Sequence, residues 1–162
     1  MGAQMLPDAD SGDVIGEIPG RERPEEVVVI GGHIDSWDVG QGAQDDGASI
    51  MACLQALAIV HQLGLQPRRT LRVAFWVNEE NGTRGGEAYR GFVGDQLKNQ
   101  WRLSKWTAAR RTPRGFGAGV DEKSLELLRQ IGKLLEPSAL ARSPRAVAAR
   151  TSRRWCATAW SA

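Results

Sequence analysis

Two parts of the sequence combine residue types that bind metal ions or transfer protons. The glycine-rich segment GGHIDSWDVGQGAQDDGAS (residues 31–49) contains His33 and four aspartates. The segment WVNEENG (residues 76–82) contains the adjacent acids Glu79 and Glu80. Imidazole nitrogen and carboxylate oxygen suit zinc, and manganese or cobalt can use the same donors. A divalent cation would also compensate the negative charge of acids placed so close together.

The segments that flank these residues predict a strand, a helix and a second strand. Residues 25–32 (EEVVVIGG) and residues 70–82 (TLRVAFWVNEENG) begin as the short apolar runs of strands buried on both faces. Between them, residues 45–64 place apolar side chains at helical spacing. This order predicts a right-handed parallel crossover. Because the carboxyl ends of parallel strands face one edge of a sheet, we expect both groups of polar residues to meet there.

Each of these polar residues also has an ordinary structural explanation. A single histidine such as His33 is more often a hydrogen-bonded residue at a strand end than a ligand. Asp45 and Asp46 are typical of a helix N-terminus, where acids interact favourably with the helix dipole. Glu79 and Glu80 are typical of a solvated turn. Their expected meeting at one edge of the sheet is what favours a metal site.

Two further elements are predicted, and two segments fit no element. Residues 13–20 alternate apolar and polar side chains before a Pro-Gly turn, which indicates a strand. Residues 121–136 repeat leucine and isoleucine at helical spacing and predict a helix that ends before Pro137. Residues 100–110 and residues 138–162 show no regular period.

The motifs GGHIDS, GQGAQDDGAS and FWVNEENGTRGG together resemble the di-zinc aminopeptidases, in particular their plasma glutamate carboxypeptidase (carboxypeptidase Q-like) branch. The three motifs stand in the order of that family and cover about residues 10–99. The resemblance implies an α/β fold, a three-layer zinc-exopeptidase (phosphorylase/hydrolase-like) domain with a mixed central sheet. This chain would carry an incomplete version of that domain.

The resemblance also implies a role for five residues of this sequence. His33 and Glu80 would each bind one zinc ion, and Asp45 would bridge the two ions. Glu79 would act as the general base toward the attacking water and then protonate the leaving amine. Asp35 would orient the imidazole of His33 without binding metal itself.

Three nearby polar residues receive other expectations. Asp46 would follow a cis peptide bond in this family. Asp38 matches no ligand position, so we expect it to be solvated. His61 lies inside the predicted helix, and we expect it not to bind metal.

Some ligands implied by the resemblance are missing from the sequence. The family binds two zinc ions through five protein ligands, and the motifs above supply three of them. No histidine follows His61, and no acid after Glu80 stands in a motif like Glu-Ser-Asp-Ser-Gly. We therefore expect the chain to bind at most one zinc ion tightly and to have weak or no peptidase activity.

Charge divides the chain into two unlike parts. Residues 1–99 hold 8 Lys and Arg against 15 Asp and Glu, whereas residues 100–162 hold 13 against 4. The second part is also rich in tryptophan. This contrast indicates a partial catalytic domain over residues 1–137, with an anomalous segment at 100–110, and a basic Ala- and Arg-rich tail over residues 138–162.

We interpret both anomalous segments as frameshifted translation after about residue 99. Shifted by one base, the codons for residues 101–109 permit Val-Ala-Ala-Val-Glu-Met-Asp-Ser-Gly, which contains the missing aspartate. GC-rich codons for glycine become codons for alanine or arginine in the same way, which explains the composition of residues 138–162.

The expected function is hydrolysis of a terminal peptide bond in a short peptide by a zinc-dependent exopeptidase. The alternative is a non-catalytic remnant or an interaction domain. Arginine with interleaved tryptophan in the tail could also bind nucleic acid, but the acidic first part opposes this and we expect no such partner. No apolar run is long enough for a membrane span, and residues 1–20 lack the pattern of a signal peptide, although the resembled family is often exported.

Overall fold

The computed structural model describes residues 4–105, 116–117, 122–134 and 147–148. The chain divides into two compact units, residues 1–108 and residues 109–162. The first unit contains every residue of the predicted site, so it is described in more detail.

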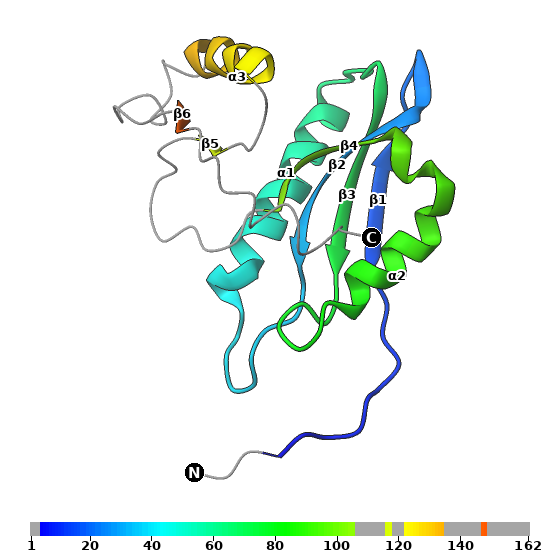
Figure 1. Cartoon of the computed structure of the whole chain (residues 1–162), viewed down its shortest axis with the longest axis vertical. Coiled ribbons are helices and arrows are strands. Elements are labelled where there is room, and N and C mark those ends of the chain that lie inside the picture. Colours follow the sequence, from blue (N-terminus) through cyan, green and yellow to red (C-terminus); the bar gives the residue numbers. More distant parts are fainter. Residues whose placement is uncertain (1–3, 106–115, 118–121, 135–146, 149–162) are drawn as a thin grey trace. The chain divides into compact units, whose positions relative to one another are not determined.

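The first unit is built on a four-stranded mixed sheet with the order β1-β3-β2-β4 (Figure 1). β2 (Arg23–His33) lies between β3 (Arg69–Trp76) and β4 (Gln100–Lys105) and is parallel to both. β1 (Val14–Ile18) pairs antiparallel with β3 at one edge. The sheet is therefore mixed, as the family resemblance implied.

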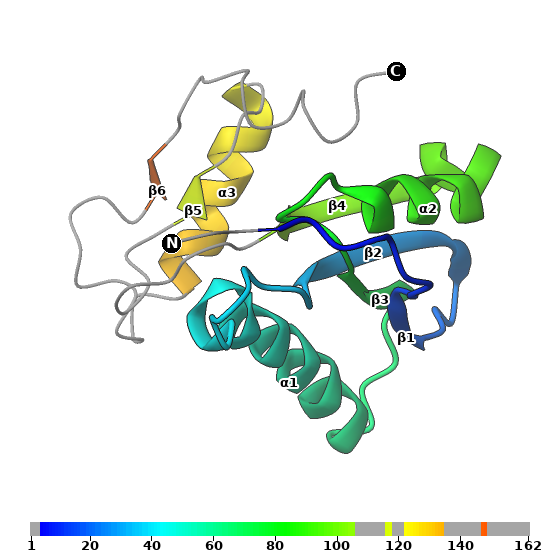
Figure 2. The same ribbon diagram turned by 90° about the horizontal axis from the view of Figure 1, so that it is seen from below.

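Two helices connect the strands and cover opposite faces of the sheet (Figure 2). A short π-helical turn (Ala43–Gly47) leads into α1 (Ala48–Gln62), which connects β2 to β3. α2 (Arg84–Val93) and a 3₁₀ helix (Gly94–Asn99) connect β3 to β4. The predicted strand–helix–strand crossover is confirmed, and a second crossover follows it.

The core of this unit lies along the two central strands. Val27 and Val29 of β2 are buried, and four consecutive residues of β3 are buried as well, from Arg72 to Phe75. Three of these β3 residues, Val73, Ala74 and Phe75, are apolar, and successive buried apolar positions are typical of a strand covered on both faces.

The segment without a regular period, residues 100–110, is in part a strand. β4 occupies residues 100–105 and pairs with β2 at Val27, Val28, Val29 and Gly31, with an irregularity in register after Val29. Backbone hydrogen bonds to a neighbouring strand do not require side-chain alternation, so the pattern gave no signal for it. Residues 106–110 lie outside the described residues.

In the described part of the second unit there are one helix and one pair of short strands. α3 (Glu122–Leu134) confirms the predicted helix over residues 121–136. β5 (Phe116–Gly117) and β6 (Val147–Ala148) pair in parallel. Among the described residues, no helix of either unit is both long and apolar enough to cross a bilayer.

Candidate metal centre

Four of the predicted site residues meet at the carboxyl ends of β2 and β3. His33 is the last residue of β2, and its Nε2 lies 3.1 Å from Oδ1 of Asp45, in the turn before α1. The same nitrogen lies 3.9 Å from Oε2 of Glu79, shortly after β3. His33, Glu79 and Glu80 each offer one donor atom, and these three atoms all lie within 4.8 Å of one another. The edge of the sheet thus brings an imidazole and three carboxylates together, as predicted.

The surroundings of His33 define which of its ring nitrogens faces the acids. The side chain is fully buried, and Nδ1 lies 3.0 Å from the backbone carbonyl oxygen of Asp35. A carbonyl oxygen only accepts hydrogen bonds, so Nδ1 carries a proton. Nε2 then faces the carboxylates of Asp45 and Glu79. The free nitrogen of an oriented histidine facing acids is a common feature of metal sites.

Asp35 connects the two loops of the site. Its carbonyl oxygen contacts Nδ1 of His33, and its Oδ1 lies 3.5 Å from the same nitrogen. Its two carboxylate oxygens also accept the backbone N–H groups of Glu79, at 3.0 Å, and Glu80, at 3.1 Å. The predicted contact with His33 is therefore present, and Asp35 in addition fixes the backbone that carries the glutamates.

Asp46 supports His33 from the other side. The peptide bond between Asp45 and Asp46 is cis, as the family resemblance implied. The carboxylate of Asp46 is buried, and its Oδ2 accepts the backbone N–H of His33 at 3.1 Å. Burial raises the pKa of Asp46, and the hydrogen bond from His33 acts in the opposite direction. A Cβ at Gly32 would lie 2.1 Å from this oxygen, so glycine is required for the close approach.

A tight turn after β3 presents the two glutamates. Asn78 has a positive φ of 59°, a conformation that asparagine tolerates better than most residues. Its carbonyl oxygen accepts the N–H of Thr83 at 2.6 Å, and its side-chain oxygen accepts the N–H of Arg84 at 3.4 Å. Glu79 and Glu80 thus lie inside a closed turn whose backbone is held at both ends.

Asp45 and Glu79 differ in exposure, although both lie beside His33. The side chain of Asp45 is 48% exposed, whereas that of Glu79 is 30% exposed. Both contact the imidazole of His33, so the division between ligands (His33, Asp45 and Glu80) and base (Glu79) stays a prediction. Asp38 is exposed, as expected.

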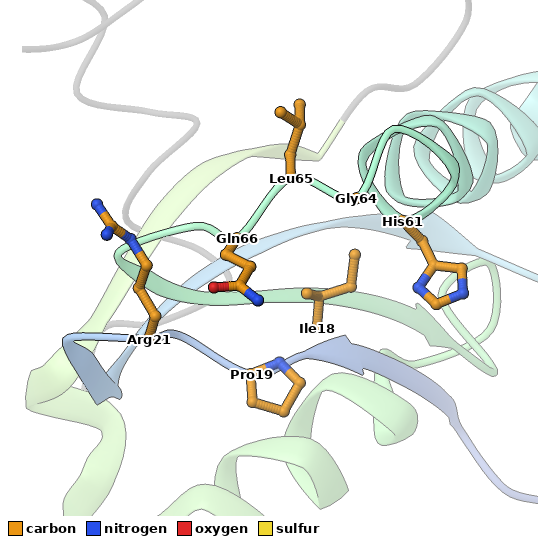
Figure 3. A pocket seen from close by; sticks show the side chains of 7 residues that line it. All are labelled: Ile18, Pro19, Arg21, His61, Gly64, Leu65 and Gln66. Carbon is orange, nitrogen blue, oxygen red and sulfur yellow. The ribbon is translucent and has the colours of Figure 1, made fainter.

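His61 does not join the candidate metal centre. It lies in the last turn of α1 and lines a shallow cavity of about 430 Å³ together with Ile18, Pro19, Arg21, Gly64, Leu65 and Gln66 (Figure 3). The cavity is formed by the end of β1, the β1–β2 connection, the end of α1 and the segment after α1. The expectation that His61 is not a ligand of the site is consistent with this position.

Sequence reasoning missed one residue that contacts the turn. Asp13, just before β1, accepts the backbone N–H of Val77 at 3.0 Å, although 64 positions separate the two residues. No local pattern connects them, and only the antiparallel pairing of β1 with β3 brings them together.

The first unit is thus an α/β domain with a candidate metal centre at the carboxyl ends of its parallel strands. The sequence pattern of Peptidase family M28 matches residues 13–105, more than half of the chain. The chain therefore belongs to Peptidase family M28.

Similar proteins cover most of this chain. Carboxypeptidase Q of Homo sapiens is 39% identical over 137 residues, which are 85% of this chain and 29% of that protein. Carboxypeptidase Q of Xenopus laevis is 37% identical over the same shares of each chain. The chain thus spans about 29% of the length of these relatives.

Solved structures show the same fold. A peptidase M28 precursor from Shewanella amazonensis SB2B has a TM-score of 0.65 and 33% identity, and the match covers 85% of this chain and 29% of that one. An aminopeptidase from Aneurinibacillus sp. strain AM-1 has a TM-score of 0.60 over 85% of this chain and 34% of that one. Its identity is 19%, so this second likeness concerns the fold alone.

Proposed function

We propose that this domain provides part of the metal centre of a zinc-dependent exopeptidase that hydrolyses a terminal peptide bond of short peptides. The observation that carries the proposal is the meeting of His33 with Asp45, Glu79 and Glu80 at one edge of the sheet. Membership of Peptidase family M28 and similarity to carboxypeptidase Q support the reaction class.

The donor set fits zinc better than a harder cation. An imidazole whose Nδ1 donates to a carbonyl oxygen offers Nε2 as a ligand, and the carboxylates supply oxygen donors beside it. His33, Asp45 and Glu80 would hold the ion. When bound, zinc supplies a positive charge that favours ionisation of water and stabilises negative charge on a substrate carbonyl oxygen.

Glu79 is the residue of this chain suited to move the proton. Its carboxylate reaches to 3.9 Å from Nε2 of His33 and is partly exposed, so water and substrate can approach it. Asp35 accepts its backbone N–H, which limits its movement. Glu79 would take a proton from the attacking water at a carboxylate oxygen and deliver it to the departing amine.

The described part of the chain supplies three of the five ligands expected in this family. With one histidine and two acids, we expect one tight zinc site and weak or no turnover. The second candidate is a non-catalytic remnant or interaction domain, favoured by the sheet edge at β4, which has no strand beyond it among the described residues.

Isothermal titration with zinc, together with an aminoacyl-anilide hydrolysis assay, tests the proposal. We expect one zinc ion per chain and hydrolysis at or near background. Two tight sites with turnover would contradict the expected impairment. Absence of any zinc binding would contradict the metal centre and favour the remnant.

A further inference from the structure

A carboxylate outside the candidate metal centre holds the start of the turn that carries the two glutamates. Oδ1 of Asp13 accepts the backbone N–H of Val77 at 3.0 Å. Val77 is the first residue after β3 and stands two positions before Glu79. Asp13 stands directly before β1. The side chain thus connects the start of one edge strand to the first residue of the turn.

Strand pairing does not supply this hydrogen bond. The ladder between β1 and β3 ends with Val14 opposite Phe75, so the amide of Val77 lies beyond it. The side chain of Asp13 takes the place of the missing strand partner. A half-buried backbone N–H without an acceptor is unfavourable, so the loss of this oxygen would favour another conformation of the turn.

Gly85 of α2 packs against the contact between Asp13 and Val77. Its backbone N–H donates to the carbonyl oxygen of Val77 at 3.1 Å. A Cβ at this buried position would lie 2.5 Å from Oδ1 of Asp13 and 2.5 Å from both N and O of Val77. Both backbone polar groups of Val77 are therefore held, one by Asp13 and one by Gly85. A side chain at position 85 would displace this contact, so only glycine fits there.

We propose that Asp13 is a positioning residue of the metal centre, which keeps Glu79 and Glu80 within reach of His33 by fixing Val77. The inference rests on the proposed function, because it assumes that these three side chains serve a metal ion. The acceptor oxygen carries the effect, and the negative charge of Asp13 is not required. Asp35 holds the middle of the same turn, and Asp13 holds its beginning.

Two substitutions separate the acceptor from the charge. Asp13→Asn keeps an oxygen that can accept from Val77, whereas Asp13→Leu has a similar shape and no acceptor. We expect Asp13→Leu to weaken zinc affinity by about 10- to 100-fold, the range seen for residues that orient metal ligands. Asp13→Asn should restore affinity to about that of the wild type. Asp10→Leu, at an exposed position of the same segment, is the matched control and should leave affinity unchanged.

Cobalt provides a readout that general loss of stability would not reproduce. The visible absorption of Co²⁺ bound to the wild type should match that of Asp13→Asn and differ from that of Asp13→Leu, because the positions of the carboxylates change. Wild-type affinity and spectrum in Asp13→Leu would overturn the inference. Zinc binding by Asp13→Asn that is as weak as that by Asp13→Leu would overturn the inference as well.

The folded wild type offers a measurement that does not depend on any variant. The hydrogen bond predicts a scalar coupling between the amide nitrogen of Val77 and the carboxyl carbon of Asp13 in NMR. If Asp13→Leu fails to fold, the coupling in the wild type decides. Absence of the coupling overturns the inference. Presence of the coupling, together with wild-type zinc affinity in Asp13→Asn, supports it. Failure of the wild type itself to bind zinc would contradict the proposed function and would leave Asp13 a structural residue only.

Discussion

Asp35 shows how one side chain can organise a site built from two loops. It contacts the ring of His33 through its carbonyl oxygen and accepts two backbone N–H groups through its carboxylate. The sequence motif indicated only the first contact, two residues away along the chain. The second depends on a turn 44 and 45 positions further on, which no local pattern connects to it.

Replacing Asp35 by asparagine should therefore weaken metal binding. The side chain of asparagine has one oxygen, which can replace only one of the two carboxylate oxygens as an acceptor. Its amide nitrogen would face the other backbone N–H, so two donors would meet there. We expect Asp35→Asn to lower zinc affinity by about 10- to 100-fold, measured by isothermal titration. Asp38→Asn, an exposed aspartate of the same loop, is the control. Equal affinities of the two variants would show that Asp35 does not position the site.

The burial of Asp13 makes stability depend on pH. Burial raises the pKa of Asp13 above its ordinary value of 3.8, and the hydrogen bond from Val77 only partly opposes this. The folded state then binds more protons than the unfolded state between the two pKa values, so the free energy of unfolding falls as pH rises through that range.

In the Asp13→Asn variant, the free energy of unfolding should not show this fall with rising pH. We expect the difference in free energy of unfolding, variant minus wild type, to increase as pH rises above 3.8 and to become constant above the folded-state pKa. Urea unfolding of the metal-free protein at a series of pH values measures it. A difference that stays constant or decreases would contradict the assigned pKa shift.

At the scale of elements, the approach of α1 to β2 explains the glycine before His33. A Cβ at Gly32 would meet the carboxylate of Asp46 at 2.1 Å and the side chain of Ile50 at 3.0 Å. The turn before α1 thus packs directly against the backbone of β2. This close contact lets Asp46 accept the N–H of His33.

Gly32→Ala should consequently destabilise the domain by about 1–3 kcal/mol, the usual cost of overpacking. Gly86→Ala is the control, because a Cβ at this position in α2 has no atom within 4 Å. That change should be neutral or stabilising by up to about 1 kcal/mol. Chemical unfolding measures both, and equal stabilities would contradict the close packing of Asp46 on β2.

The elements that the sequence predicted are those with a strong local period. Apolar runs identified β2 and β3, and helical spacing identified α1 and α3. α2 was not predicted, because its sequence RGGEAYRGFV has three glycines and few apolar residues. Its burial depends on single residues such as Tyr89, whose hydroxyl accepts from Arg72 of β3 and donates to Gln100 of β4. Such contacts exist only after the sheet has formed.

At the scale of the whole molecule, the chain corresponds to 29% of carboxypeptidase Q. A match of 137 residues within 162 must cross residues 100–110 and reach α3. The match therefore includes sequence on both sides of residues 100–110.

The frameshift hypothesis is tested on the encoding DNA. Shifted by one base, the codons for residues 101–109 should encode Val-Ala-Ala-Val-Glu-Met-Asp-Ser-Gly or a close variant. An uninterrupted frame without these codons would contradict the hypothesis. In that case the strand β4 and the absence of a motif like Glu-Ser-Asp-Ser-Gly after Glu80 would be native properties of the chain.

The central claim is that the described domain binds zinc through His33 and neighbouring carboxylates. X-ray absorption at the zinc edge tests it most directly, with one equivalent of zinc on the wild type, His33→Ala and His61→Ala. We predict a first shell of nitrogen and oxygen at about 2.0–2.2 Å with imidazole scattering. The imidazole signal should be lost in His33→Ala and kept in His61→Ala. Sulfur at about 2.3 Å, or an imidazole signal that survives His33→Ala, would contradict the account.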